Sequence, residues 1–371
     1  MLKVLSKLRT VLHIDAGEVW SGIEQRIFSI SRSLNSKQFK IILAVSPSSP
    51  LCKKAGSYNI PLLSLKIGRW KFNPVVIWKL SRFLKTHKVD ILHTHRSSDH
   101  WIGVLAVRLF GLSGQCKIIR TRHNFTRIKN NWINNKLYKE WTDRIIAVAE
   151  VIKRQLIDEN NISENKIITI HSSIDTKKFK GEFDSGKIRN EFGILPDTVV
   201  LGMVGRLREH KDYPNMFEAL KIIIEKFRNI KLLIVGDGIL ESQLKSMVQK
   251  MKLSNYVIFA GKRESIPQIL SGIDIFVLSS SVEGSPAVIK EALIMEKPVV
   301  STNAGGIPEI VQDGITGVLV PPHNPEALAN AIFEAINNME KALEMARKGK
   351  QVIINEFSET RLAQLTAEVY R

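Results

Sequence analysis

Short apolar segments alternate with longer helix-like segments along almost the whole chain, and the pattern occurs twice. After the polar, Gly-containing stretch 176–186 the alternation begins again. The strand-like runs are residues 8–14, 40–45, 91–93, 117–120 and 144–148, then 199–204, 231–235, 257–259, 275–278, 298–301 and 317–320. Strands joined by helices form parallel sheets, so the sequence predicts an α/β fold of two doubly wound, Rossmann-like domains.

The length of the chain, 371 residues, also fits two domains better than one. We place an N-terminal domain at residues 1–176 and a C-terminal domain at residues 177–371, with a hinge near 176–197. The last helix of the chain is able to pack back on the first domain. Ligands of doubly wound sheets bind beyond the carboxyl ends of the strands. The active site is therefore expected in a cleft across which the two domains face each other.

Two features bear on the cellular compartment. No apolar run is long enough to cross a membrane, and the N-terminus leads into a predicted strand without a cleavage-like site. Cys52 and Cys116 are too few and too far apart for a zinc site or a disulfide framework, so reduced thiols are expected. Together these features predict a cytoplasmic protein.

Two glutamates, Glu283 and Glu291, follow the strand-like run 275–278 and indicate a ligand site. Ser285 and Pro286 are typical of an N-cap and a first helical residue, so Glu291 should lie about a turn and a half into a helix. Free N–H groups at a helix start attract a diphosphate, and carboxylates accept hydrogen bonds from sugar and ribose hydroxyls. The spacing alone also fits an amphipathic helix with two solvated glutamates, so the neighbouring motifs decide between these interpretations.

Two further loops carry groups suited to a phosphate ligand. Arg206 and Lys211 follow a strand-like run, where two cations can neutralise the charge on a departing nucleoside diphosphate. Near the N-terminus, Ser21 and Glu24 form a capping-box signature that predicts a helix start at Gly22, with a bare backbone that a ligand can approach closely. Solvated surface loops are the alternative interpretation of both segments.

Histidines lie near the ends of two consecutive strand-like runs. His93 should point into the packed face of its strand and be structural, whereas His95 and His123 follow the strand ends and are better placed to contact a substrate. The sequence has no carboxylate-rich cluster and no His/Cys spacing that suggests a metal site. It also lacks Gly-x-Ser-x-Gly and Walker sequences.

The combination of motifs resembles the retaining glycosyltransferases of family four, which have the GT-B fold of two Rossmann-like domains. The resemblance covers almost the entire chain and is specific because several motifs occur in order. These motifs are Gly205-Arg206 with Lys211, Glu283 and Glu291 separated by seven residues, and the segments 303–311 and 313–317.

The resemblance implies a role for each matching residue. Arg206 and Lys211 bind the donor pyrophosphate, Glu291 holds the ribose, and the loop at Ser21 and Gly22 closes over the phosphates. Glu283 and His123 contact the transferred sugar, and Lys262 borders the base. The implied catalytic set is His123, Arg206, Lys211 and Glu283; the implied donor-binding set is Ser21, Gly22, Lys262, Ala287, Val288, Ile289 and Glu291. The nucleoside-diphosphate sugar is the substrate, and no metal or other cofactor is implied.

Basic residues are concentrated in the first domain. Residues 1–176 contain 29 Lys and Arg against 12 Asp and Glu, whereas residues 177–371 contain 25 against 24. This asymmetry predicts a positive potential that attracts an anionic acceptor or membrane surface. Cations mixed with aromatic side chains occur in segments 66–72 and 120–139, and the candidate acceptor-binding residues are His95, Arg122, Arg127 and Trp132.

The favoured hypothesis is a retaining, hexosyltransferase-like enzyme that moves a sugar from a nucleoside-diphosphate sugar to an envelope glycan or lipid-linked acceptor. The pathway would be lipopolysaccharide or other surface polysaccharide biosynthesis, in the cytoplasm or peripherally at the inner face of the membrane. Two alternatives stay open. One is a sugar-nucleotide epimerase or hydrolase of the same architecture; the other is a nucleic-acid-binding protein, which the absence of a recognised nucleic-acid motif disfavours.

Overall fold

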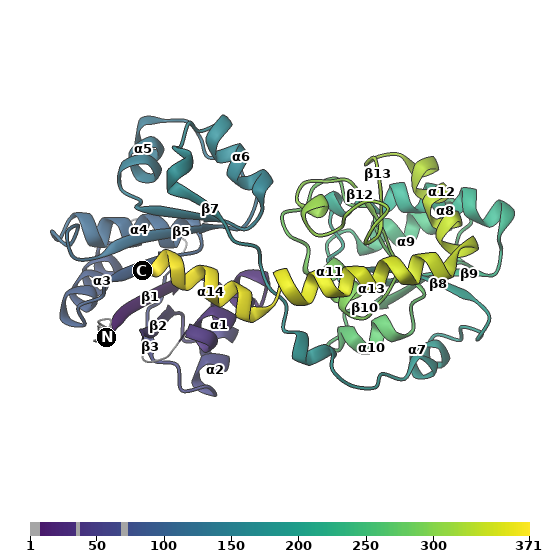
Figure 1. The fold of residues 1–371 in the computed structure, drawn as a ribbon, viewed down its shortest axis with the longest axis horizontal. Helices are drawn as coiled ribbons and strands as arrows, with labels where there is room; N and C mark the ends of the chain where they lie inside the picture. The colour runs from purple at the N-terminus through teal and green to yellow at the C-terminus, as the bar shows by residue number, and fades with distance from the viewer. Residues whose placement is uncertain (1–7, 35–37, 68–72) are drawn as a thin grey trace, which may run out of the picture. The chain divides into compact units, whose positions relative to one another are not determined.

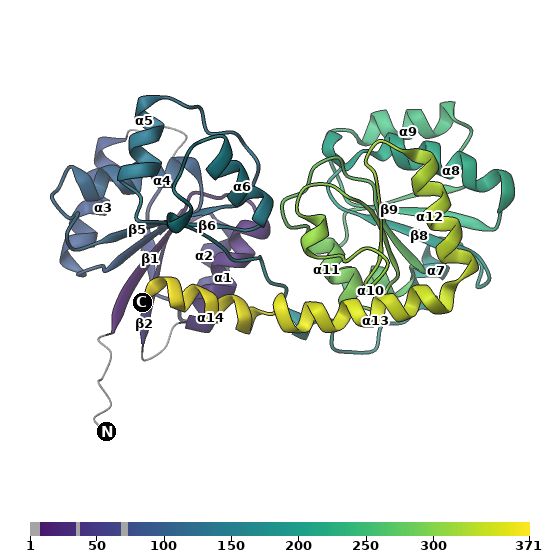
Figure 2. The same cartoon turned by 45° about the horizontal axis from the view of Figure 1, so that its top comes forward.

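The computed structural model, shown in Figures 1 and 2, describes residues 8–34, 38–67 and 73–371. The described residues form two parallel sheets, each covered by helices, which confirms the predicted α/β class with two Rossmann-like domains. None of the helices in this part of the chain is long and apolar enough to cross a membrane. Both cysteines are free thiols, as expected.

The chain divides into two compact units. Unit 1 comprises Met1–Ser173 together with Glu359–Arg371, and unit 2 comprises Ile174–Ser358. The chain thus enters unit 2 close to the boundary predicted at residue 176. Most of the predicted hinge lies inside unit 2, where Ile188 is part of the core.

Unit 1 contains a seven-stranded parallel sheet in the order β3-β2-β1-β4-β5-β6-β7. Its strands are β1 (Arg9–Asp15), β2 (Phe39–Val45), β3 (Leu62–Ser64), β4 (Ile91–Thr94), β5 (Lys117–Arg122), β6 (Arg144–Ala147) and β7 (Ile167–Thr169). The two edge strands, β3 and β7, have three residues each, too few for a periodic pattern, and the sequence did not predict them.

Helices cover both faces of this sheet (Figure 2). They are α1 (Gly22–Leu34), α2 (Pro50–Gly56), α3 (Pro74–Thr86), α4 (Ser97–Arg108), α5 (Trp132–Asn135), α6 (Glu150–Asp158) and α14 (Glu359–Tyr370), with short helical turns at Lys136–Glu140 and Glu164–Lys166. The α3, α4 and α6 residues pack on one face, and the α1, α2 and α14 residues on the other. Helix α14, yellow in Figure 1, follows unit 2 in the sequence but packs against α1 of unit 1.

Unit 2 contains a six-stranded parallel sheet in the order β10-β9-β8-β11-β12-β13. Its strands are β8 (Val199–Val204), β9 (Ile230–Val235), β10 (Val257–Gly261), β11 (Ile275–Leu278), β12 (Val299–Thr302) and β13 (Val318–Val320). Its helices are α7 (Ser185–Glu191), α8 (Tyr213–Lys226), α9 (Glu241–Lys250), α10 (Ile266–Ser271), α11 (Ala287–Ile294), α12 (Pro325–Asn337) and α13 (Met339–Glu356), with short turns at Thr176–Phe179, Glu209–Lys211 and Ile307–Glu309. The central strands β8 and β11 are apolar throughout because helices cover both faces.

Both sheets reverse their strand order at an equivalent place, between β1 and β4 in unit 1 and between β8 and β11 in unit 2. Loops that leave two neighbouring strands at such a point turn to opposite faces of the sheet and leave a crevice, where doubly wound proteins bind ligands. The loops after β1, β4, β8 and β11 are therefore the places where a site is expected.

Candidate active site

Lys211 and Glu283 form an ion pair at the point where the strand order of unit 2 reverses. Lys211 lies in the loop after β8 and Glu283 in the loop after β11, and their Nζ and Oε1 atoms are 2.6 Å apart. The two side chains are only 11% and 12% exposed. The Ser280 hydroxyl donates to the same Glu283 oxygen at 2.9 Å. The sequence predicted both residues for the site but did not predict that they bind each other.

Hydrogen bonds between the two loops hold this pair in place. The Ser279 hydroxyl lies 2.9 Å from the backbone oxygens of Lys211 and Asp212, and the Ser281 N–H donates to the His210 carbonyl at 2.8 Å. The pair therefore rests on a backbone framework and not on two freely moving side chains.

A glycine pair fixes the backbone of Glu283. The Gly306 N–H donates to the Glu283 carbonyl oxygen at 2.8 Å. Gly305 has a φ of +58°, and a Cβ atom at this position would lie 2.1 Å from the same oxygen. Only glycine permits this approach, which explains the two glycines in segment 303–311.

Helix α11 begins one residue later than predicted. Pro286 is the N-cap, with φ −64° and ψ 117°, whereas Ser285 lies before the cap and accepts a hydrogen bond from Lys290 Nζ at 3.0 Å. Proline suits this position because its ring holds φ near the value required, but it provides no side-chain cap. The N–H groups of the following residues have no partner within the helix and can receive an anion. These residues are Ala287, Val288 and Ile289.

Glu291 lies in the second turn of α11 and is partly buried. Burial raises the pKa of its carboxyl to about 7, although the Lys178 and Lys290 ammonium groups act in the opposite direction. The carboxyl therefore titrates near neutral pH, where a bound hydroxyl group can shift it toward the ionised form.

The other two cations of the predicted donor site remain in contact with solvent. Arg206, directly after Gly205 at the end of β8, is exposed, and so is Lys262, directly after β10. Their side chains are free to close on a ligand, in contrast to Lys211.

The loop after β1 in unit 1 is held by a network of charged groups. The Glu24 carboxylate accepts from the Ser21 N–H at 2.8 Å and also bonds the Ser21 hydroxyl, so one half of the predicted capping box is present. The Ser21 hydroxyl oxygen accepts from the Ile23 N–H at 3.3 Å, and the predicted helix start at Gly22 is confirmed. Arg96 bonds both Glu24 and Asp15, the latter at 2.7 Å. A Cβ atom at Gly22 would meet nothing within 4 Å, so the backbone there is open to a ligand.

Sequence reasoning did not identify Asp15 or Arg96. Burial, followed by the nearby Asp99, raises the pKa of Asp15 to about 7, whereas Arg96 lowers it. Asp15 is the last residue of β1, and Arg96 lies two residues after β4 as the N-cap of α4. Their position just at or after the ends of central strands was the signal that could have identified them.

The structure corrects two of the four expected acceptor contacts. His95 is buried, and both of its ring nitrogens face other histidines, His13 and His123. Arg122 is buried as well and donates to the Thr126 carbonyl. Both side chains pack beneath their loops because the strands carry them into the core, so neither is exposed for an acceptor.

The remaining acceptor candidates are at the surface. Trp132, on α5, is 73% exposed. The Arg127 side chain is 82% exposed and lies 3.3 Å from Glu159. Lys66 of the basic segment 66–72 is exposed, whereas residues 68–72 lie outside the described residues. His93 is buried, as expected of a structural residue.

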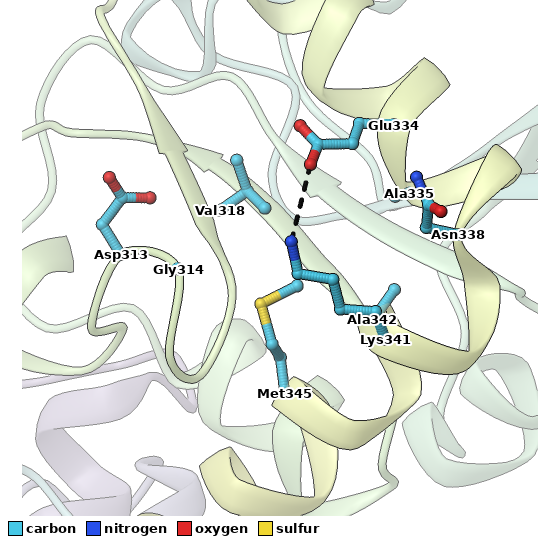
Figure 3. A pocket seen from close by; sticks show the side chains of 9 residues that line it. All are labelled: Asp313, Gly314, Val318, Glu334, Ala335, Asn338, Lys341, Ala342 and Met345. Carbon is cyan, nitrogen blue, oxygen red and sulfur yellow. Dashed lines mark ion pairs between the residues drawn. The ribbon is translucent and has the colours of Figure 1, made fainter.

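A separate hollow of about 190 Å³ lies on unit 2 between the segment after Val311 and helices α12 and α13 (Figure 3). Its lining includes the ion pair between Lys341 and Glu334, 3.8 Å apart. None of the predicted donor-binding residues lines this hollow.

Two family models match consecutive parts of the chain. The model described as Glycosyltransferase Family 4 matches residues 20–178, and the model described as Glycosyl transferases group 1 matches residues 184–352. The chain belongs to glycosyltransferase family four. The predicted family is thereby confirmed, and so is the prediction that the protein is a sugar-transferring enzyme.

Individual relatives agree with this assignment. The glycosyltransferase is 29% identical to the UDP-Gal:alpha-D-GlcNAc-diphosphoundecaprenol alpha-1,3-galactosyltransferase of Escherichia coli, over 98% of this chain and 97% of the relative. It is 30% identical to the capsular polysaccharide biosynthesis glycosyltransferase CapM of Staphylococcus aureus, over 58% and 57% of the two chains. A solved glycosyltransferase from Rickettsia africae superposes with a TM-score of 0.86 at 23% identity, covering 98% of both chains.

Proposed function

We propose that this enzyme transfers a hexose from a UDP-sugar to a lipid-linked sugar diphosphate, with retention of the anomeric configuration. The pathway would be lipopolysaccharide or another surface polysaccharide. The full-length similarity to the Escherichia coli galactosyltransferase supports the choice of donor and acceptor. The observation that carries the chemistry is the Lys211–Glu283 pair beside the uncapped start of α11, at the reversal point of unit 2.

In this proposal the donor diphosphate binds at the start of α11, and Lys211 and Arg206 neutralise the charge that grows on it as the glycosidic bond breaks. The acceptor hydroxyl then attacks from the face that the diphosphate is leaving, and a phosphate oxygen accepts its proton. The residues position the reactants and stabilise charge, so the reaction needs neither a covalent nucleophile nor a metal.

Glu283 has a different role from a nucleophile. Its Oε1 atom is already bonded to Lys211 and Ser280, and its backbone is fixed by the glycine pair. A carboxylate held in this way is suited to accept hydrogen bonds from sugar hydroxyls and to keep Lys211 in place.

Transfer assays with the full-length protein test the proposal. Purified enzyme would be incubated with UDP-galactose, UDP-glucose or GDP-mannose and a short-chain lipid diphosphate carrying N-acetylglucosamine. We expect a product from a UDP-sugar, with the donor's anomeric configuration by NMR. UDP at 100 times its dissociation constant should also stabilise the protein by about 2.7 kcal/mol. Hydrolysis or epimerisation of the donor without a transfer product would favour the alternative enzyme class.

The raised pKa of Glu291 leads to a pH-dependent affinity. Ribose hydroxyls donate to the ionised carboxylate, so UDP should bind more tightly as pH rises through about 7, by up to about tenfold between pH 6 and pH 8. Isothermal calorimetry at a series of pH values measures this. Glu291→Gln is the matched control, since its amide oxygen accepts at every pH and the variant retains the titration of every other group, including Asp15 and the diphosphate itself. If the plots of UDP affinity against pH were parallel for the wild type and the variant, Glu291 would not bind the ribose.

We also propose that unit 1 docks on an anionic membrane surface, which would bring the enzyme to a lipid-linked acceptor. Exposed apolar side chains lie on α3, at the end of α4 and on α5, in the helix layer on one side of the sheet (Figure 2). They are Val75, Trp78, Leu109, Phe110, Trp132 and Ile133. Basic groups accompany them; the Arg82 guanidinium lies 5.6 Å from the centre of the Trp78 ring. Aromatic and basic side chains together are typical of surfaces that bind lipid headgroups.

Vesicle co-sedimentation tests this docking. The protein should bind vesicles that contain anionic lipid and bind neutral ones much less, and salt should weaken binding because the Debye length falls from about 10 Å at 0.1 M to about 3 Å at 1 M. Replacing Arg82, Arg127 and Lys129 by Glu should lower the partition coefficient at least about 100-fold, at roughly 1 kcal/mol for each charge. Lys221, Lys245 and Lys348 replaced by Glu form the control, with the same change of net charge on unit 2. If both triple variants lost vesicle binding equally, binding would depend on the net charge of the protein and not on this surface of unit 1.

A further inference from the structure

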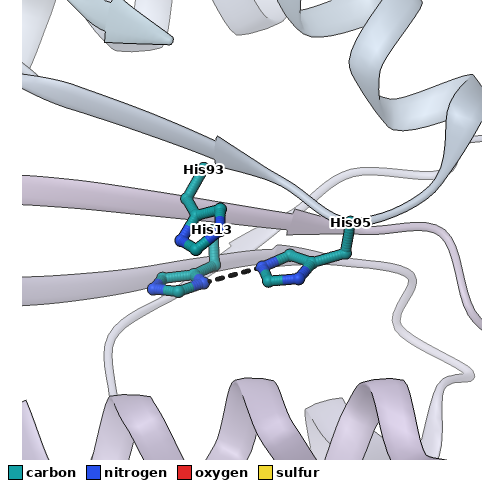
Figure 4. A group of neighbouring side chains, drawn as sticks. All are labelled: His13, His93 and His95. Carbon is teal, nitrogen blue, oxygen red and sulfur yellow. Dashed lines mark hydrogen bonds between the residues drawn. The ribbon is translucent and has the colours of Figure 1, made fainter. Parts of the chain in front are cut away.

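An unbroken series of hydrogen bonds crosses the core of unit 1 and ends at His123. Figure 4 shows its centre, where the rings of His13, His93 and His95 lie together and the first and last are joined by a hydrogen bond. From one end to the other, the bonds are Thr121 Oγ1 to His93 Nε2 (2.7 Å), His93 Nδ1 to Tyr370 Oη (2.6 Å), Tyr370 Oη to His13 Nε2 (3.0 Å), His13 Nδ1 to His95 Nε2 (3.0 Å) and His95 Nδ1 to His123 Nε2 (3.3 Å). We call these six residues the polar chain.

The members of the polar chain come from distant parts of the sequence. His13 and His93 are paired in register on β1 and β4, Thr121 is on β5, and Tyr370 is on α14. Every member except His123 is buried, and His123 is partly buried. The polar chain therefore connects a helix that follows unit 2 in the sequence with His123, a member of the catalytic set that the family resemblance implies.

Neutral rings leave only two arrangements of the protons. Loss of contact with water lowers the pKa of His13 to about 3 and those of His93, His95 and His123 well below their ordinary value. A neutral imidazole has one N–H donor and one acceptor nitrogen, and a hydroxyl has one hydrogen. A hydroxyl oxygen can accept two hydrogen bonds, but Tyr370 is fully buried and, among the described residues, its hydroxyl bonds only to His93 and His13. Its hydrogen must therefore be donated to one of these rings, because it would otherwise have no partner in the core. Each bond then has one donor and one acceptor, and all six members donate in the same direction along the polar chain.

Thr121 decides the direction. Its hydroxyl is fully buried, and among the described residues it bonds only to His93. If it accepted that bond, its own hydrogen would have no partner in the core, which is unfavourable. Thr121 therefore donates, and the same direction continues through Tyr370 and His13 to the last bond, in which His95 Nδ1–H donates to His123 Nε2. The proton of His123 is then on Nδ1, the ring nitrogen that makes no bond to another member of the polar chain.

We propose that Thr121 and Tyr370 are positioning residues that hold His123 as its Nδ1–H tautomer, so that it offers the transferred sugar a hydrogen-bond donor. The proposal rests on the proposed function and on the contact between His123 and the transferred sugar that the family resemblance implies. It adds a requirement on the substrate: the sugar must have an oxygen acceptor where it meets His123. A donor whose sugar lacks the oxygen at that position would lose the hydrogen bond from His123.

A bound metal is the rival explanation of the three central histidines. His13, His93 and His95 each offer a nitrogen, and these atoms lie within 4.8 Å of one another. Every nitrogen of the three rings already has a hydrogen-bond partner, however. A metal would have to break bonds of the polar chain, so the hydrogen-bonded arrangement accounts for the cluster better.

NMR of the full-length protein with ¹⁵N-labelled histidine rings tests the tautomer directly and does not depend on transfer activity. His123 should have its proton on Nδ1, and Tyr370→Phe should increase the Nε2–H form, because the variant removes one hydroxyl and keeps the buried ring. A wild-type His123 protonated on Nε2, or ring signals of metal-bound histidine with stoichiometric zinc in the purified protein, would overturn the proposal.

Kinetics separate positioning from a merely structural role. Tyr370→Phe and Thr121→Val should each lower kcat by up to about tenfold, the worth of one ordinary hydrogen bond, whereas Thr121→Ser should keep the wild-type rate. The affinity for UDP should not change in any of these variants, because UDP does not contain the transferred sugar that His123 would contact. In a His123→Ala background the Tyr370→Phe change should have no further effect. A loss of the same size in that background would show that Tyr370 does not act through His123.

Discussion

Replacing Lys211 by methionine is expected to lower kcat for sugar transfer by about 10²–10³-fold, because the variant lacks a cation that, in the proposed mechanism, neutralises the charge on the departing diphosphate. Methionine keeps the aliphatic stem, so packing in the loop after β8 should change little. The charge on the diphosphate grows as the bond breaks, and the loss in kcat should therefore exceed the loss in UDP affinity. Steady-state kinetics and calorimetry on the same preparation measure the two quantities.

Arg208→Ala is the matched control for this variant. It removes the same charge from the same loop, but Arg208 is exposed and is not part of the predicted donor motif. We expect its kcat to stay close to the wild-type value. If Lys211→Met lost affinity and rate by the same factor, Lys211 would act in ground-state binding alone.

Removing residues 359–371 is expected to destabilise unit 1 by more than about 5 kcal/mol, which is comparable with the whole stability of a typical domain. Helix α14 buries Leu362, Ala363, Thr366, Ala367 and Tyr370 against unit 1. Its Glu359 carboxylate also accepts from the Ser29 hydroxyl at 2.5 Å and pairs with Arg32. Unit 2 spans Ile174–Ser358 and does not include the deleted residues.

Calorimetric unfolding should therefore show that the truncated protein loses the transition of unit 1 and keeps that of unit 2. Two full-length variants calibrate the result. Leu362→Ala, a buried site, should cost about 2–5 kcal/mol, whereas Gln364→Ala, on the exposed side of the same helix, should cost less than about 0.5 kcal/mol. An unchanged unit 1 transition after truncation would show that α14 contributes little to this unit.

Elements with strong local patterns could be predicted from the sequence. The apolar runs at β8 and β11 have the predicted bounds. The helix start at Gly22, with Glu24 bonded to the Ser21 N–H, was predicted for the same reason, since this signal needs only residues three positions apart. The start of α11 was misplaced by one residue because both Ser285 and Pro286 suit an N-cap, and only the backbone conformation distinguishes them.

Contacts between distant segments could not be predicted. The sequence indicated Lys211 and Glu283 separately, but their ion pair depends on which strands are neighbours in the sheet. His95 was misjudged because the end of a strand does not determine where the next side chain points. The bond between His13 and Tyr370 joins residues 357 positions apart, and no local pattern carries such information.

The discontinuous sequence of unit 1 also constrains how the enzyme is made. Domains generally fold as units while the ribosome synthesises them, the N-terminal one first. Here α14 is translated only after all of unit 2, so unit 1 is the first to be synthesised in part but cannot complete its fold before unit 2 has been synthesised. Until α14 docks, the apolar residues of α1 that pack with it have no cover, and His93 Nδ1 and His13 Nε2 lack their bonds to Tyr370. Nascent unit 1 is thus the stage at which chaperones would bind, and His123 receives its hydrogen-bonded support only after both sheets have been synthesised.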